Sequence, residues 1–351
     1  MMRNKVVDQF FDFFFYLLVL FAPLIVYGIN IGDFSLRFSR LIIVVILPLT
    51  ILKITINPNL FFRDRFLILI FIPYLTYTAI TSYWSPNVET GTVSQRLGGL
   101  IEIFLLYVTT IVANLTQERF EKFLIFLKYS LIVPILVCLW QFLNNIYNLS
   151  ESEVPFSFLT ITGKYELLNG RVFVATSGFS RLSSTFAEPT IFGCFMSVTF
   201  LILLVKTSKK RTLFDKIIFI SVLLVILLTL SKLALILLLF GFLIISFQDK
   251  RYFKMLVFIL IFLLVAVFSL DELGLSAIFE RLTMDTGHVD LLKHTLDEFE
   301  KINIFTGASI GSIPYGSWHR FILSRVYESG FVGFLFVLGV CYLPIALLLR
   351  K

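Results

Sequence analysis

The segment from Ser180 to Pro189, SRLSSTFAEP, places an arginine and a carboxylate directly before an apolar stretch. The guanidinium of Arg181 is a planar fork of donors that suits a phosphate, so the segment could form an anion site at a membrane surface. Pro189 fits the first turn of the helix that the apolar stretch predicts, and Glu188 would lie near its N-terminus, where a carboxylate is favoured. The alternative is a well-capped helix start in which Arg181 pairs with Glu188, and composition favours neither.

A second candidate lies at His319, which begins an amphipathic stretch that ends at Glu328 and is followed by Gly330 and Gly333. An imidazole can accept a proton near neutral pH, which is what a general base requires. The two glycines would let the following helix pack closely against a neighbour. The alternative is that His319 anchors the chain at the membrane surface.

Metal chemistry is not expected from the histidines, although His288, His294 and His319 all fall in one loop. His288 and His294 are six residues apart, which does not place them on one face of a helix, and no HExxH pattern is present. The chain also has no Asp-x-Asp pair, the usual carboxylate clamp for a metal-bound nucleotide-sugar. We therefore expect a site without metal or cofactor, and a donor other than a nucleotide-sugar.

The composition indicates which elements must position these residues. The chain is 58% hydrophobic and 15% charged, with 41 phenylalanines among its 351 residues and a mean hydropathy of +0.92. Soluble domains are about 45–50% apolar and about 25% charged, so a water-soluble fold and a disordered chain are both excluded. The net charge of +7 does not indicate nucleic-acid binding, because the basic residues cluster in short connections between apolar stretches. A single polytopic membrane domain over 1–351 is expected.

About 20 apolar residues are needed to cross a bilayer, and this length predicts an all-α bundle of about ten transmembrane helices. The first apolar run continues to about Ile31 without a small-residue cleavage site, so a membrane helix is expected there and not a signal peptide. Ser231-Lys232 interrupts a longer run and predicts a hairpin with Lys232 at its turn. The predicted spans are 10–30, 37–56, 66–82, 97–115, 124–143, 186–205, 217–230, 233–247, 255–270 and 330–349.

The basic residues also predict the orientation of the bundle. With the N-terminus in the cytoplasm, most of the 30 Lys and Arg residues fall in the shorter, inner connections, as the positive-inside rule requires. Two long connections, about 144–185 and about 271–329, then lie on the outer side. Long polar loops at one face of a bundle are where chemistry is expected.

Three features resemble the O-antigen polymerase and O-antigen ligase superfamily of bacterial surface-polysaccharide enzymes. SRLSSTFAEPTIFG is similar to an Arg-x-Ser/Gly-x-Phe-x-Glu/Asp-Pro segment before a membrane helix. TLSKLALILLLFGFLI is similar to a Ser-Arg/Lys stretch that opens a helical hairpin. His319 with Gly330 and Gly333 is similar to the ligase pattern, except that Arg320 occupies its second position. The resemblance covers roughly 175–340 and implies a GT-C-like membrane fold.

The resemblance implies glycosyl transfer, without metal, on the outer face of the cytoplasmic membrane. A glycan would move from an undecaprenyl-pyrophosphate carrier to an acceptor hydroxyl, with a chain-length regulator and a flippase as further partners. His319 would take the proton from the acceptor, and Glu188 would orient Arg181 or an acceptor sugar. Where relatives often have an arginine, this chain has His288, and Lys293 or Arg281 could substitute. The residues expected on the glycan or diphosphate are Arg181, Arg281, His288, Lys293, Arg320 and Arg325.

The leading interpretation is a polymerase that joins lipid-linked repeat units of O-antigen, capsule or exopolysaccharide. A ligase that transfers finished polymer to an acceptor is the close alternative. A lipid-linked glycan flippase would place ionisable residues at mid-membrane. Few such residues lie within the predicted spans: Glu102 is the clearest, and Asp12 lies near a membrane edge. A purely structural subunit would not need two long loops bearing arginine and histidine.

Overall fold

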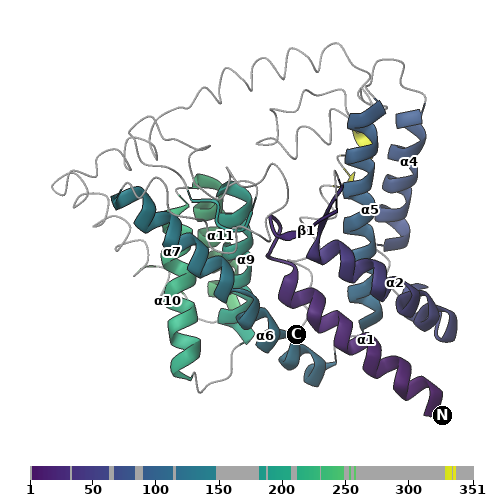
Figure 1. The fold of residues 1–351 in the computed structure, drawn as a ribbon, viewed down its shortest axis with the longest axis horizontal. Helices are drawn as coiled ribbons and strands as arrows, with labels where there is room; N and C mark the ends of the chain where they lie inside the picture. Colours follow the sequence, from purple (N-terminus) through teal and green to yellow (C-terminus); the bar gives the residue numbers. More distant parts are fainter. Residues whose placement is uncertain are drawn as a thin grey trace. The chain divides into compact units, whose positions relative to one another are not determined.

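The computed structural model describes residues 2–31, 34–62, 67–83, 90–113, 116–147, 182–186, 189–206, 212–229, 231–248, 253, 257, 329–333 and 335–336 (Figure 1). These residues are mostly helical, as the composition predicts. They belong to two compact units. Unit 1 comprises Met1–Asp12, Ile43–Leu115 and Asp285–Lys351, and unit 2 comprises Phe13–Ile42 and Thr116–Met284.

The described helices and strands are given in chain order. They are α1 (Met2–Phe21), β1 (Gly28–Ile31), β2 (Phe34–Arg37), α2 (Phe38–Ile56), α3 (Asn59–Phe62), the π-helical turn η1 (Leu67–Phe71), α4 (Ile72–Tyr83), α5 (Thr90–Ala113), α6 (Gln117–Ser130), α7 (Ile132–Tyr147), α9 (Pro189–Lys206), α10 (Leu213–Leu228) and α11 (Lys232–Gln248).

The first predicted span, 10–30, is wrong at both ends. The helix α1 begins at Met2 and ends at Phe21, two residues before Pro23, which has no N–H to continue the helical ladder. The chain then forms an antiparallel pair of strands, β1 and β2, and the predicted span had included most of β1 in the helix. Gly28 is required in this hairpin, because a Cβ atom there would lie 2.1 Å from the carbonyl oxygen of Leu36.

Unit 1 is held together by aromatic packing and one buried lysine. Tyr74 of α4 stacks on Phe336, with ring centroids 4.0 Å apart, so the described part of the C-terminal segment packs on α4. Lys53, in the last turn of α2, pairs with Asp8 at 2.6 Å and lies 4.3 Å from the ring centroid of Phe11. Lys53 is buried, and the carboxylate and the ring together stabilise its charge.

Unit 2 contains a hydrophobic core to which α6, α7, α9, α10 and α11 contribute. The predicted hairpin over 217–230 and 233–247 is confirmed as α10 and α11, which are joined at Thr229–Ser231. The predicted span 124–143 lies within the apolar stretch Gln117–Asn144, in which α6 and α7 are joined at Leu131. Pro134, in the first turn of α7, is tolerated there because that turn needs no N–H.

Among the described residues, two helical stretches are long and apolar enough to cross a membrane. They are Phe38–Ile56 and Gln117–Asn144. The shorter apolar helices include Pro189–Leu204 and Lys232–Ser246. The span expected over 255–270 lies outside the described residues apart from Val257, and only the beginning of 330–349 is described.

Candidate functional site

The centre of the candidate site is the loop Leu182–Phe186, in which every residue is buried. Ser184 has φ of 51°, which is the left-handed region and is uncommon for a residue with a side chain. Its backbone N–H donates to Oε1 of Gln141 at 2.8 Å, and its hydroxyl donates to the carbonyl of Pro134 at 2.5 Å. Two bonds to α7 therefore hold the strained residue in place.

The second half of the loop is anchored to the segment that follows α1. The hydroxyl of Thr185 donates to the carbonyl of Pro23 at 2.6 Å, and the N–H of Val26 donates to the carbonyl of Thr185 at 3.1 Å. The N–H of Phe186 donates to the carbonyl of Ser183 at 3.0 Å and closes the turn. Contacts that are distant in sequence thus fix the path of the backbone on both sides of the turn.

The sequence-predicted site residues flank this loop. The helix α9 begins at Pro189, which confirms the proline in the first turn. Phe186 packs against Phe192 and Phe195 of α9, with ring centroids 5.3 and 5.1 Å apart, so loop and helix form one packed element. Arg181 and Glu188 lie outside the described residues. Their covalent neighbours, Leu182 and Pro189, belong to this element.

The turn between α10 and α11 packs against the beginning of α9. A Cβ atom on Gly193 would lie 2.8 Å from both Oγ1 of Thr229 and Cβ of Ala234, and 3.3 Å from Cβ of Ser231. One turn further along α9, the hydroxyl of Ser197 donates to the carbonyl of Ala234 at 2.9 Å. The glycine therefore permits a close approach of the turn that carries Ser231.

A lysine follows this turn directly. Lys232 is the first residue of α11 and is exposed, directly after the turn that contacts Gly193. The sequence predicted Lys232 at the turn of a hairpin, within the stretch that resembles the family's Ser-Arg/Lys segment, but did not include it among the site residues. Its position in the sequence could have identified Lys232 as a candidate site residue, because the α10–α11 hairpin follows α9, the helix that comes after the segment with Arg181.

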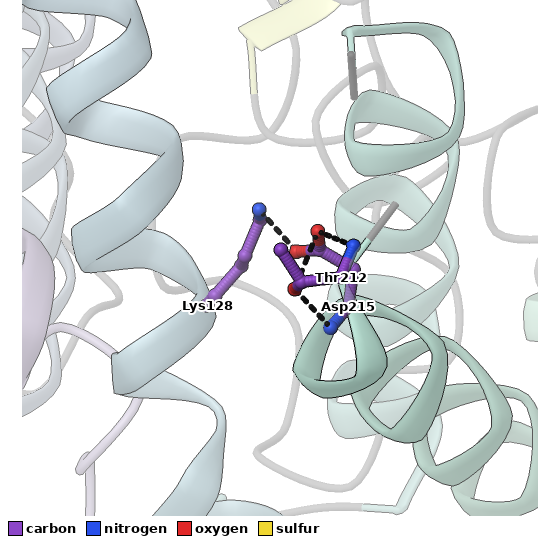
Figure 2. Close-up of polar contacts among 3 residues, drawn as sticks. All are labelled: Lys128, Thr212 and Asp215. Atoms are coloured by element: carbon purple, nitrogen blue, oxygen red, sulfur yellow. Dashed lines mark hydrogen bonds and ion pairs between the residues drawn. The ribbon is translucent and has the colours of Figure 1, made fainter. Parts of the chain in front are cut away.

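At the other end of α10, charges are paired with one another (Figure 2). Nζ of Lys128 lies 2.5 Å from Oδ1 of Asp215. The N–H of Thr212 donates to Oδ2 of Asp215 at 2.9 Å, and the N–H of Asp215 donates to the hydroxyl of Thr212 at 3.2 Å, which makes a capping box. Burial raises the pKa of the Asp215 carboxyl, but the hydrogen bonds from Lys128 and Thr212 outweigh burial and hold this pKa below its usual value. Since these groups satisfy one another, the cluster joins α6 to α10 and is not a candidate site.

The second motif is described only in part. His319 lies outside the described residues, as do Arg281, His288, Lys293, Arg320 and Arg325. Gly330 and Gly333 are helical, and Gly330 has φ of 54°, a conformation that favours glycine. Ser329 beside it is buried. A glycine at position 330 is therefore explained by the left-handed backbone conformation at the start of this segment.

In the described part of the chain, no group of three or more His, Cys, Asp or Glu side chains could hold a metal ion. The described cysteines, Cys138 and Cys194, are free thiols. No protein-family model, curated protein or solved structure matches this chain.

Proposed function

We propose that this chain is a multi-pass glycosyltransferase of the cytoplasmic membrane that polymerises undecaprenyl-pyrophosphate-linked repeat units on the outer face. The resemblance of three ordered motifs to O-antigen polymerases and ligases is the starting point. The observation that carries the proposal is the buried, strained loop Leu182–Phe186 between Arg181 and Pro189. Strained backbone that is held by several bonds recurs at binding and active sites, where it fixes a neighbouring group in one orientation.

The membrane setting is supported by apolar faces that are exposed on α10 and α11. Ile220 is 70% exposed and Ile236 is 62% exposed, and neither helix has a charged residue in its middle. The exposed positions recur every three or four residues, so each helix has one apolar side that does not face the protein core. They are Leu213, Ile217, Ile220 and Leu224 on α10, and Leu233, Ile236, Phe240 and Leu243 on α11. Such faces are suited to contact with the lipid chains of a membrane.

In the proposed reaction, an acceptor hydroxyl attacks the anomeric carbon of the lipid-linked glycan. A new glycosidic bond forms as the bond between this carbon and the diphosphate oxygen breaks, and His319 takes the hydroxyl proton. The leaving group is undecaprenyl pyrophosphate, whose charge Arg181 would stabilise in place of a metal ion. Lys232 is a second cation for the diphosphate, because it follows the turn that packs on Gly193.

A ligase is the second candidate, and the spacing of His319, Gly330 and Gly333 favours it. Arg320, which departs from the ligase pattern, favours the polymerase. Both enzymes take the same donor and differ in the acceptor. The chemistry proposed for Arg181 and His319 is common to the two.

Deletion of the gene, followed by gel analysis of the surface glycan, tests the proposal. Single repeat units in the mutant support the polymerase, and polymer that stays on its lipid carrier supports the ligase. Complete loss of glycan from the outer face would point to a flippase and contradict both. Reporters fused near Lys164 and Lys301 should read extracytoplasmic, and a cytoplasmic signal at either would overturn the orientation.

A further inference from the structure

One exposed lysine of α10 carries a charge that no described residue neutralises. The side chain of Lys216 forms no ion pair or hydrogen bond with any residue that the structure describes. Three other lysines, by contrast, are each paired with a carboxylate, namely Lys53, Lys122 and Lys128. The ammonium group of Lys216 is therefore the described lysine charge that is open to an anion from outside this set of residues.

The neighbouring carboxylate does not neutralise this charge. Asp215 is buried, with Nζ of Lys128 at 2.5 Å from its Oδ1, and its Oδ2 accepts a hydrogen bond from the N–H of Thr212 (Figure 2). Successive residues of a helix point about 100° apart, so Lys216 lies to the side of this cluster, and it is exposed. The ion pair that joins α6 to α10 therefore occupies the acidic group and leaves a positive charge beside it on the surface.

Lys216 lies at one end of an exposed apolar face of α10. Leu213, three residues before Lys216, is 74% exposed, and Ile220, four residues after it, is exposed as well. Residues three and four apart lie on the same side of a helix, so the lysine and these side chains form one surface. Helical side chains tilt toward the N-terminus of their helix, so the ammonium group extends toward the beginning of α10. The apolar side chains continue in the opposite direction through Leu224, so the surface has one cationic end and an apolar length.

Exposed aromatic side chains lie at the same end of α10. Tyr129 of α6 is 50% exposed, and the centroid of its ring lies 5.6 Å from that of Phe214, which is also exposed. Tyrosine is enriched where a bilayer meets water, with its ring at the level of the lipid head groups, and lysine side chains extend to the same level. In the predicted orientation this end of α10 faces the cytoplasm. The aromatic pair and Lys216 would then lie at the inner surface of the membrane.

We infer that Lys216 binds the head group of an anionic phospholipid of the inner leaflet, whose acyl chains pack along Ile217, Ile220 and Leu224. The head group supplies a negative charge for the ammonium, and the acyl chains cover the exposed apolar side chains. Inorganic phosphate would satisfy the charge but would leave the apolar side chains uncovered, so a lipid fits both parts of the surface. The inference rests on the membrane setting of the proposed function and is independent of glycosyl transfer.

The test uses the purified full chain in detergent micelles, with bound lipids counted by native mass spectrometry. The two probes are phosphatidylglycerol and phosphatidylcholine with identical acyl chains, so that only the head group differs. We expect the wild type to prefer phosphatidylglycerol. Lys216→Gln should bind phosphatidylglycerol about 5-fold more weakly, the effect of one cation at a membrane surface, and phosphatidylcholine with unchanged affinity. Lys216→Arg keeps the charge and should bind both lipids like the wild type.

Lys122→Gln is the matched control, because it removes the same net charge from an exposed lysine. Lys122 is already paired with Glu118 at 2.8 Å, so its replacement should change the affinity for phosphatidylglycerol by less than about 2-fold. Lys216 is exposed, so the melting temperature of Lys216→Gln should equal that of the wild type.

Three results would overturn the inference. Wild-type affinity of Lys216→Gln for both lipids would show that no head group is bound there. An equal loss in Lys122→Gln would show that only the net charge of the chain matters. Displacement of phosphatidylglycerol by an equal concentration of inorganic phosphate would show a site for free anions that needs no acyl chain. A wild-type chain that does not float with vesicles of the two lipids would instead contradict the membrane setting of the proposed function.

Discussion

Gln141 of α7 and Ser184 of the buried loop are 43 residues apart, and their hydrogen bond of 2.8 Å holds Ser184 in the left-handed conformation. A non-glycine residue in this region is strained by about 1–3 kcal/mol and persists only where its surroundings determine it. Here the surroundings are the amide of Gln141, the carbonyl of Pro134 and the burial of the whole turn. The backbone of the loop therefore has a defined path from Leu182 to Phe186.

Replacement of Gln141 by leucine should release this loop. The N–H of Ser184 would remain buried without an acceptor, and we expect a loss of roughly 1–3 kcal/mol in the free energy of unfolding. Polymer synthesis should fall with it, because Arg181 would lose its fixed neighbour. Thermal melts of the purified chain and glycan gels measure the two effects. Gln117→Leu, the same change at an exposed position of α6, is the matched control, and equal behaviour of the two variants would contradict the role of this bond.

The contact of α9 with the α10–α11 turn should not tolerate a methyl group at Gly193. A Cβ atom there would lie 2.8 Å from Thr229 and Ala234, so Gly193→Ala should destabilise the chain by about 1–3 kcal/mol through overpacking. Gly99→Ala on α5 is the control, since no heavy atom lies within 4 Å of its added Cβ. Alanine favours a helix over glycine by up to about 1 kcal/mol, so the control should melt at the same or a higher temperature. A Gly193→Ala variant as stable as Gly99→Ala would argue against the close packing.

The ion pair between Lys128 and Asp215 should contribute stability only above acidic pH. The pKa of Asp215 is lower in the folded chain than its usual value of about 3.9, so its ionised form stabilises the fold. This contribution is complete above the unfolded pKa and is lost as the pH falls through the folded pKa. Asp215→Asn should therefore lower the melting temperature at pH 7, and its difference from wild type should shrink below about pH 4.

A second carboxylate provides the control for this experiment. Glu118 pairs with Lys122 at 2.8 Å, but both side chains are more than half exposed. Exposed pairs contribute little, so Glu118→Gln should change the melting temperature only slightly at any pH. A constant offset of Asp215→Asn across the whole pH range would show that the pair does not titrate as proposed.

Arg181→Lys should impair the proposed transfer while the protein stays folded. An ammonium group keeps the positive charge but cannot make two parallel bonds to a phosphate. We expect turnover with the extracted lipid-linked substrate to fall on the order of 10- to 100-fold, the effect of one charge-assisted hydrogen bond. Wild-type turnover in this variant would argue against a bidentate clamp on the diphosphate.

His319→Ala should abolish long-chain polysaccharide and leave the protein in the membrane. The loss of a general base typically lowers a rate by about 100- to 10,000-fold. Gel analysis of the surface glycan, with an immunoblot of the membrane fraction, separates loss of activity from loss of protein. Normal chain lengths would exclude His319 as the base.

The sequence by itself determined the helical class, the α10–α11 hairpin and the beginning of α9 at Pro189. These features depend on local chemistry, namely the length of apolar runs, the break at Ser231-Lys232 and a proline in the first turn. The hairpin of β1 and β2 also has a local signal, because Gly32-Asp33 between two short apolar runs is a two-residue turn pattern. The predicted membrane span covered this pattern in part, because the chain has no charged residue from Phe13 to Ile31.

Only the tertiary structure decided how the candidate loop is held. The amide that fixes Ser184 and the carbonyl that fixes Thr185 come from residues 43 and 162 positions away, and no sequence spacing connects such pairs. The same holds for Lys128 and Asp215, which are 87 residues apart, and for the α10–α11 turn, whose contact with α9 depends on the space left at Gly193. Local sequence sets the length and the ends of a helix. Which segments the helix packs against depends on the burial and hydrogen bonding that form only in the folded chain.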